Sequence, residues 1–318
     1  MQISAMPTLA LVVILSFSTG ANSSYSAHSA DDSVKIIAQS SFVDSEGRLN
    51  IVGTVRNTGT LPVQAILGLE VQDKAGIRIE QQQPTYGRII FPLNDSPFKF
   101  VIESGSAGDP FIVDVKEVGA TQITDMIILN YSSMAAGQER AFVGTVKNNA
   151  PFDIYNVSVF ASVRSENATQ LDSVKSNVIP VLKASEEQLF IAIPDPAVKS
   201  RVYYYSCAGL DLDNPITTID AGGGKFIAYD LNAAAQVSAI RYENETDSVA
   251  FRIRPYSPAG GPISFMLPQV SQNQTVTVMV DGKLHEASIR PDGKTIFIDF
   301  FVPQGEHPVQ IQGVRNMP

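Results

Sequence analysis

The sequence predicts an all-β protein made of tandem β-sandwich domains after an N-terminal export signal. Short segments rich in Val, Ile, Phe and Tyr recur along the chain, and turn clusters of Gly, Asn, Asp and Pro separate them at about ten residues, a spacing typical of sandwiches and barrels. No stretch keeps a helical periodicity over several turns, and the best candidate, Leu231–Val237 with its three alanines, predicts at most a short helix. One strand pattern also occurs twice, which indicates a repeated domain.

The composition agrees with a globular protein and excludes several classes of partner. The chain has 318 residues, of which 44% are hydrophobic, enough for about two or three domains with buried cores. Asp and Glu outnumber Lys and Arg by 32 to 23, the formal net charge is −9, and the basic residues form no cluster. We therefore expect no nucleic-acid partner, because phosphate binding needs a basic surface, and no attraction to an anionic membrane surface.

Residues 1–21 have the layout of a secretory signal peptide. They contain no charged side chain, and the apolar run Leu9–Phe17 is followed by small residues that favour cleavage after Ala21. An uncleaved membrane anchor is the alternative, although the apolar run is shorter than the roughly 20 residues that a spanning helix needs. Residues 22–33 are small and polar, which predicts a flexible tether. We expect an extracellular or cell-surface protein with no membrane span unless the signal segment is retained.

The repeat places the first two domains at residues 34–120 and 125–208. The segment Val52–Gly59 matches Val143–Ala150 roughly ninety residues later. Each match is followed by a Pro-containing turn and by a strand with alternating apolar residues, which puts one set of side chains on a buried face. The residues expected on matching buried faces are Val52 and Val143, Val55 and Val146, Leu67 and Val159, Phe98 and Leu189, and Phe100 and Ile191.

A repeat of about ninety residues with roughly seven short strands fits an immunoglobulin-like sandwich. The repeated motif consists of Gly53, Val55, Asn57, Asp73 and Gly76 in the first copy and of Gly144, Val146 and Asn148 in the second. This pattern resembles FxLYD-type immunoglobulin-like modules. The resemblance implies an extracytoplasmic β-sandwich without catalytic residues. From the residues themselves, we expect Asn57 and Asn148 to close a turn with their side chains.

Residues 209–226 are predicted to be a linker, and a third β-sandwich is expected over 227–318. Asp281-Gly282 between two alternating segments is a strong hairpin signal. The third domain resembles the C-terminal β domain of archaeal exported surface proteins, through Val278–Lys283 and Val309–Gly313. Its strand order should differ from that of the first two domains, because the repeated motif is missing. The expected strands are Val237–Tyr242, Val249–Arg254, Ile263–Leu267, Thr275–Val280, Ala287–Arg290, Thr295–Phe301 and Val309–Val314.

The sequence contains no recognisable catalytic motif, so we expect no enzymatic activity and no cofactor. The single cysteine, Cys207, is interpreted as a small buried strand residue. Asp211, Asp213 and Asn214 have the oxygen spacing of a calcium loop but lack its Gly and its final Glu, so they are a weak metal hypothesis. The chain has seven Asn-x-Ser/Thr sequons, whereas chance gives roughly two. The glycosylation candidates are Asn130, Asn156, Asn167, Asn244 and Asn273.

These observations predict a non-enzymatic exported protein at the cell surface, a glycoprotein whose tandem sandwiches form a scaffold for protein–protein interaction in the cell envelope. The expected partners are other envelope or surface proteins. The alternative is a ligand- or calcium-binding accessory module of a membrane-associated complex, with its site at Asp211 and Asp213 or on the aromatic strand Tyr203–Tyr205.

Overall fold

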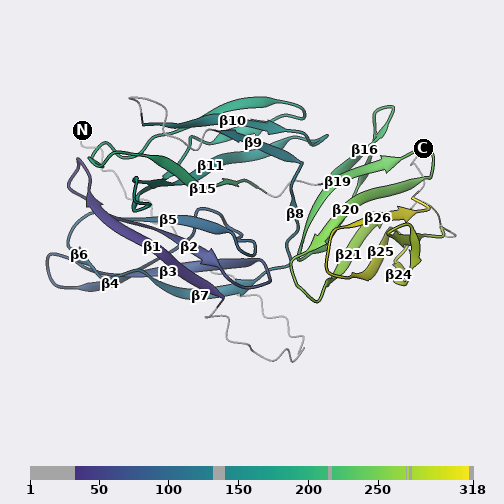
Figure 1. Cartoon of the computed structure of the whole chain (residues 1–318), viewed down its shortest axis with the longest axis horizontal. Helices are drawn as coiled ribbons and strands as arrows, with labels where there is room; N and C mark the ends of the chain where they lie inside the picture. The colour runs from purple at the N-terminus through teal and green to yellow at the C-terminus, as the bar shows by residue number, and fades with distance from the viewer. Residues whose placement is uncertain (1–32, 132–139, 214–216, 270, 272–273, 315–318) are drawn as a thin grey trace, which may run out of the picture.

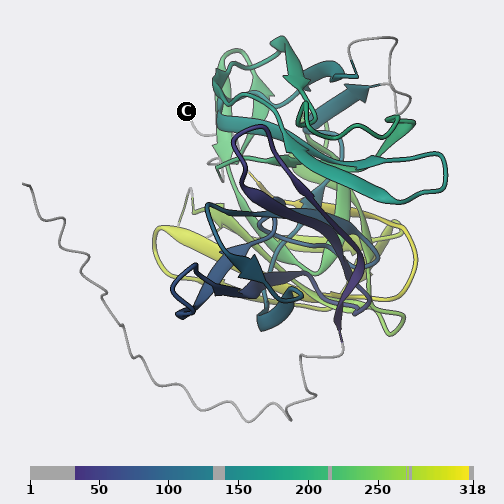
Figure 2. The ribbon, with the colours of Figure 1, turned by 90° about the vertical axis from the view of Figure 1, so that its left-hand side faces the viewer.

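The computed structural model describes residues 33–131, 140–213, 217–269, 271 and 274–314. The predicted signal peptide and nearly all of the predicted tether lie outside these residues. The described residues form β-strands and no helix, so the all-β class is confirmed. The strands build several sheets that enclose three separate hydrophobic cores, and Figures 1 and 2 show how these sheets are layered.

The N-terminal sheet pair consists of two facing antiparallel sheets around the first core. One sheet has the order β1-β2-β5, and the other has β3 between β4 and β7, with the short strand β6 beside it. Alternate residues of β3, including Leu67 and Leu69, are fully buried between the sheets, as the period-two pattern requires. The strands are β1 (Val34–Val43), β2 (Leu49–Asn57), β3 (Val63–Gln72), β4 (Arg78–Pro84), β5 (Asp95–Ile102), β6 (Ser106–Ala107) and β7 (Phe111–Glu117).

The middle sheet pair repeats this arrangement. The order β14-β10-β9 corresponds to β5-β2-β1, and β11 lies between β12 and β15 as β3 lies between β4 and β7. The strand order therefore agrees with the sequence repeat. An additional strand, β13, pairs with the first part of β11. The strands are β9 (Ile127–Tyr131), β10 (Phe142–Asn148), β11 (Ile154–Arg164), β12 (Gln170–Lys175), β13 (Ile179–Leu182), β14 (Glu187–Ala192) and β15 (Tyr204–Asp211).

The repeated asparagines close their turns as expected. The Asn57 side chain accepts a hydrogen bond from the backbone N–H of Gly59 (2.8 Å) and donates to the carbonyl of Leu61 (2.8 Å). Asn148 does the same with Ala150 (2.9 Å) and Phe152 (2.7 Å). Both asparagines are fully buried, so their polar groups need these partners.

One set of predicted buried residues is wrong. Leu189 is 78% exposed and Ile191 44%, whereas Phe190 and the next alternate residue, Ala192, are buried in the second core. The register explains the error, because Phe98 pairs with Gly53 and Phe190 pairs with Gly144, so the third matching strand is displaced by one residue. A shift of one residue moves a whole set of side chains to the opposite face.

The first of the predicted matching pairs is also wrong as a core pair. Val52 is buried, but it lies outside the first core, and Val143 is 41% exposed. Both residues point away from their cores, because Val55 and Val146, on the opposite side of the same strands, fill the cores. Val55 and Val146, like Leu67 and Val159, are fully buried as predicted.

The C-terminal sheet pair encloses the third core. One sheet has the order β18-β21-β25-β24, and the other has the order β23-β22-β26-β20-β19-β8. Each predicted strand of this part is present. Asp281 and Gly282 both have positive φ angles, 54° and 71°, and form the expected hairpin turn. The strands are β18 (Asp230–Ala233), β19 (Ala235–Glu243), β20 (Ser248–Pro255), β21 (Gly261–Pro268), β22 (Thr277–Val280), β23 (Lys283–His285), β24 (Ala287–Pro291), β25 (Thr295–Val302) and β26 (His307–Gln312).

Two interpretations of the sequence are corrected in this part of the chain. The short helix considered at Leu231–Val237 is wrong, since alternate residues of this segment are buried in β18 and β19, and burial overrides the helical preference of alanine. The linker predicted at 209–226 contains the end of β15 and most of a hairpin of β16 (Thr218–Gly222) and β17 (Lys225–Ala228). The hairpin residues Ile219, Ala221 and Ile227 are buried in the third core.

Residues 118–126 connect the N-terminal and middle sheet pairs, and part of this segment belongs to the C-terminal sheet pair. The short strand β8 (Gln122–Ile123) pairs in parallel with β19. Beside it, the Thr121 hydroxyl donates to the carbonyl of Leu231 (2.8 Å) and accepts the N–H of Ala233 (3.0 Å). Tyr256 donates its hydroxyl to Gln122 at 2.6 Å. The chain thus fastens the N-terminal and middle sheet pairs to the C-terminal one.

Candidate functional site

The residues of the calcium hypothesis are paired with other side chains. The Asp211 carboxylate lies 2.6 Å from Arg88 Nε and 2.6 Å from Lys175 Nζ. Asp213 accepts a hydrogen bond from Asn156 at 2.6 Å and lies 3.3 Å from Arg88. Hydrogen bonds from Asn156 and Arg88 hold the pKa of Asp213 below its usual value. A cation here would have to displace Arg88 and Lys175.

Asn214, the third residue of that hypothesis, lies outside the described residues. Within the part of the chain that the structure describes, no group of three or more His, Cys, Asp or Glu side chains is arranged to hold a metal ion. On the predicted aromatic strand, Tyr205 is only 2% exposed. Its ring stacks on Phe142 with 4.7 Å between ring centroids, and its hydroxyl donates to the Arg140 carbonyl. Burial raises the pKa of Tyr205 to about 12. Tyr205 is therefore a core residue.

The described glycosylation candidates lie on the surface. Asn130 in β9, Asn156 in β11, Asn167 in the turn before β12 and Asn244 in the turn after β19 are all exposed. Asn273 lies outside the described residues. Cys207 is half-buried at a bulge of β15, with a φ angle of 53° and its sulfur 3.5 Å from an Asp95 carboxylate oxygen.

A buried polar interface joins the N-terminal and middle sheet pairs. The outward face of the β1-β2-β5 sheet packs against the outward face of β11 and β12, and Thr54 lies at its centre, fully buried. The Thr54 hydroxyl donates to Gln170 at 2.9 Å, accepts a hydrogen bond from Arg164 at 3.0 Å and lies 2.9 Å from the Ser162 hydroxyl. Complete pairing of this kind is what a polar group needs in a buried interface.

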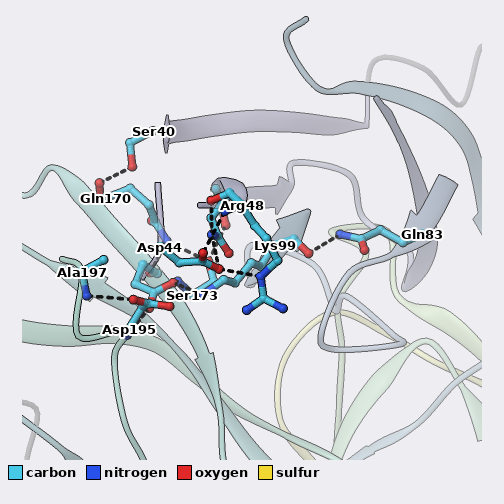
Figure 3. A network of polar contacts seen from close by, with 12 residues as sticks. Ser40, Asp44, Arg48, Gln83, Lys99, Gln170, Ser173, Asp195 and Ala197 are labelled. Atoms are coloured by element: carbon cyan, nitrogen blue, oxygen red, sulfur yellow. Dashed lines mark hydrogen bonds and ion pairs between the residues drawn. The ribbon is translucent and has the colours of Figure 1, made fainter. Parts of the chain in front are cut away.

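An ion pair lies beside Thr54 in the same interface. Lys99 Nζ on β5 is 2.9 Å from the carboxylate of Asp172 on β12, which is fully buried. Ser40 donates to the carbonyl of Gln170 (Figure 3). Asp172 also accepts the backbone N–H of Asp195 at 2.8 Å. The two sheet pairs are therefore held in one orientation by directional contacts.

No other described part of the chain covers the equivalent outward face of the middle sheet pair. We call it the β9-β10-β14 face. Its central row is Asn130, Thr145 and Leu189, which are register partners on neighbouring strands. Its large apolar side chains are exposed, and a cluster of this kind marks a site of protein interaction. They are Ile128 (36% exposed), Val143 (41%), Leu189 (78%) and Ile191 (44%).

The sequence pattern does not reveal this face, because its alternation assigns Leu189 and Ile191 to the core. One signal in the sequence points to the correct register: Phe190 lies between them, and it matches the phenylalanine that packs on the repeated glycine in the first copy.

A shallow depression on the outward side of the C-terminal sheet pair is the other candidate surface. It is lined by Arg241, Glu243, Arg252, Met279 and Gln310, among others. Arg241 pairs with Glu243 at 2.6 Å, and Gln310 donates to Glu243 at 3.0 Å. The charged groups therefore bind one another rather than converge on a common point.

No protein-family model, curated protein or solved structure matches this chain. The described residues contain no helix that is long and apolar enough to cross a membrane. The function is therefore inferred from the residues and surfaces described above.

Proposed function

We propose that this chain is an exported, non-enzymatic scaffold of the cell surface. In this proposal, three β-sandwich domains, of which the first two are immunoglobulin-like and of the FxLYD type, present binding surfaces to other envelope proteins. The N-terminal segment supports export, and the exposed sequons outside the β9-β10-β14 face, Asn156, Asn167 and Asn244, agree with a surface location.

The uncovered β9-β10-β14 face is the observation that carries the proposal. Leu189 is the most exposed of its large apolar residues at 78%, and Ile191 follows it on the same side of β14. Removing apolar surface from water is favourable by roughly 25 cal/mol per Å². A complex in which a partner covers these side chains is therefore stabilised.

The fixed orientation of the sheet pairs also supports a scaffold. The buried contacts of Thr54 and the ion pair of Lys99 and Asp172 join two sheet pairs, and β8 fastens both to the third. A body of this kind presents its surfaces at constant spacing, which suits the assembly of several proteins.

Cross-linking in intact cell envelopes tests the proposal. Leu189→Asp removes the apolar centre of the face, and Leu284→Asp is the matched control, since Leu284 is 74% exposed on β23 and lies outside the face. We expect cross-linked complexes to form with the wild-type and Leu284→Asp chains and to disappear with Leu189→Asp. Equal cross-linking of all three chains would contradict the proposal.

A further inference from the structure

The strands β5 and β14 are the same edge strand in the two copies of the repeat. Each pairs with the central strand of its sheet, β5 with β2 and β14 with β10, and with no other described strand. Their registers against the repeated glycines define which residues correspond. The corresponding residues are Phe98 and Phe190, Pro97 and Leu189, and Lys99 and Ile191.

Alternate residues of β14 turn their backbone groups away from β10. The N–H of Asn148 donates to the carbonyl of Glu186 at 2.9 Å, where the register of β10 and β14 continues past the end of β14. In an antiparallel ladder, residues bonded to the neighbouring strand alternate with residues whose N–H and C=O groups point to the other side. Leu189 and Ile191 are in the second set when the alternation is followed from Glu186, so their backbone groups point to the outer edge of the sheet.

In the first copy the chain itself occupies this edge. The N–H of Tyr86 donates to the carbonyl of Pro97 at 2.9 Å, and the Gln83 side chain donates to the carbonyl of Lys99 at 2.8 Å. This segment runs antiparallel to β5, because Gln83 precedes Tyr86 while Lys99 follows Pro97. Proline has no N–H to offer, and proline and lysine are residues with which natural edge strands prevent pairing.

In the second copy the same edge lacks these protections. Leu189 has the N–H that Pro97 lacks, an isoleucine takes the place of the lysine, and Leu189 and Ile191 are 78% and 44% exposed. The chain between β12 and β14 forms β13, which pairs with β11 of the opposite sheet, and no described backbone group takes the place of Tyr86. An edge with exposed apolar side chains and outward N–H and C=O groups is a template for another strand.

We propose that an extended segment of a partner protein adds to β14 as an antiparallel strand. This inference rests on the proposed function, because it states how a partner binds at the edge of the β9-β10-β14 face. The direction follows the segment that lies on β5 in the first copy. The main-chain groups of the added strand pair with those of Leu189 and Ile191 and extend the sheet by one strand.

The side chains of β14 define the chemistry of the added strand. Residues directly opposite each other in an antiparallel pair place their side chains on the same face, so apolar residues fit opposite Ile191 and Leu189. Glu187 is exposed, and its register partner on β10 is Lys147. A Lys or Arg of the added strand supplies the opposite charge on the other side of Glu187. In the N-to-C direction the added strand therefore has two apolar residues and then a basic residue, each separated by one residue.

A second copy of β14 does not have this pattern. Its six residues, Glu187–Ala192, include no Lys or Arg. Pairing of β14 with itself would therefore leave Glu187 without an opposite charge on the new strand. Self-association is the alternative that the experiment has to separate from binding of a partner strand.

Peptide binding to the full chain tests the inference. The chain is produced without N-glycans, because Asn130 lies on the adjoining face. The probe is the capped peptide Thr-Val-Thr-Val-Thr-Lys-Thr, whose valines lie opposite Ile191 and Leu189 and whose lysine lies opposite Glu187. We expect the peptide to bind and to slow hydrogen exchange at the amides of Leu189 and Ile191, as measured by NMR.

Methylated peptides separate main-chain pairing from apolar contact. Methylation of the two valine nitrogens removes donors that face β14 and should abolish binding. Methylation of the threonine nitrogens on either side of the second valine is the matched control, because these groups face away from β14 and binding should persist. Replacement of the lysine by glutamate should weaken binding, since it places two negative charges opposite each other.

Variants of Leu189 make the same test from the side of the protein. Leu189→Pro introduces the residue that the first copy has at this place; it keeps an apolar side chain but loses the N–H. Leu189→Ala is the matched control, because it keeps the N–H and loses apolar surface. Leu189→Pro should bind the peptide at least about tenfold more weakly than Leu189→Ala, since one hydrogen bond is lost and a peptide carbonyl is left unpaired. Thermal unfolding of both variants shows whether the fold is intact, and the methylated peptides test the wild-type chain independently.

Four outcomes would overturn the inference. They are a wild-type chain that does not bind the probe, a valine-methylated peptide that binds like the unmodified one, a folded Leu189→Pro chain that binds like Leu189→Ala, and a wild-type chain whose self-association already protects the two amides. The last outcome would assign the edge to a second copy.

The envelope cross-linking experiment separates this inference from the proposed function. Cross-linking that is lost with Leu189→Asp but equal for Leu189→Pro and Leu189→Ala would remove the added strand and leave the scaffold standing. Cross-linking that persists with Leu189→Asp would overturn the proposed function itself.

Discussion

Lys99 and Asp172 form the ion pair that joins β5 of the N-terminal sheet pair to β12 of the middle sheet pair, with 2.9 Å between the ammonium nitrogen and a carboxylate oxygen. The carboxylate is fully buried and also accepts backbone N–H groups of Ser173 and Asp195, both at 2.8 Å. The pair connects residues that are far apart in the sequence, and it belongs to the interface that sets the orientation of the two sheet pairs.

Removal of the lysine should therefore destabilise the protein. Lys99→Met leaves the Asp172 carboxylate buried without its counter-charge, and we expect a loss of about 3 kcal/mol in the free energy of unfolding. The control is Arg56→Ala, which breaks the ion pair with Asp95 at a partly exposed position and should cost less than about 1 kcal/mol. Denaturant unfolding measures both values. Equal losses for the two variants would show that the buried pair has no special role.

The repeated glycines should not tolerate a side chain. A Cβ at Gly53 would overlap the Phe98 ring and the Ala38 carbonyl, and one at Gly144 would overlap the Asn130 carbonyl. We expect Gly53→Ala and Gly144→Ala each to lower the free energy of unfolding by about 1–3 kcal/mol, as overpacking does.

Gly108→Ala is the control for these substitutions. Its Cβ would meet only the Glu70 carbonyl oxygen, at 3.9 Å, and the change in stability should stay within about 0.5 kcal/mol. A stable Gly53→Ala or Gly144→Ala chain in thermal and denaturant unfolding would disprove the steric role of the motif.

The turn between β1 and β2 should lose stability in acid. Burial acts to raise the pKa of Asp44, but hydrogen bonds from the backbone and side chain of Arg48, from Asn50 and from Glu46 together hold it well below its usual value. A carboxyl whose pKa is lower in the folded state stabilises the fold above its unfolded pKa, near 3.9, and this contribution is lost as the pH falls. The stability difference between wild type and Asp44→Asn should therefore shrink below about pH 4. Denaturation midpoints at several pH values measure it, and a constant difference would contradict the prediction.

Removal of divalent cations should leave the melting temperature unchanged. Asp211 and Asp213 are compensated by Arg88, and Asp211 also by Lys175, so no cation is needed to offset their charge. The measurement is thermal unfolding with a chelator and with added calcium. If the chelator lowers the melting temperature and calcium restores it, Asp211, Asp213 and Asn214 become metal ligands and the scaffold proposal has to include a cation.

The sequence by itself determined the elements whose causes are local. Alternating apolar residues placed the strands of the C-terminal sheet pair, Asp281 and Gly282 marked their hairpin, and Asn57 and Asn148 marked the repeated turns. These features follow from the period of two and from turn chemistry, which act over a few residues. The resemblance of the two copies in sequence likewise agrees with their common strand order.

Only the tertiary structure decided which faces are covered. Leu189 and Phe190 are both apolar, and nothing in the local pattern says which of them faces the core; the pairing of Phe190 with Gly144 decides it. The burial of Thr54 depends on a sheet more than a hundred residues away in the sequence. The ion pair of Asp211 likewise depends on Arg88, which is far from it in the sequence. The side chains of an outward face are compatible with either water or a partner. Whether such a face is covered is therefore decided only when the sheets pack together.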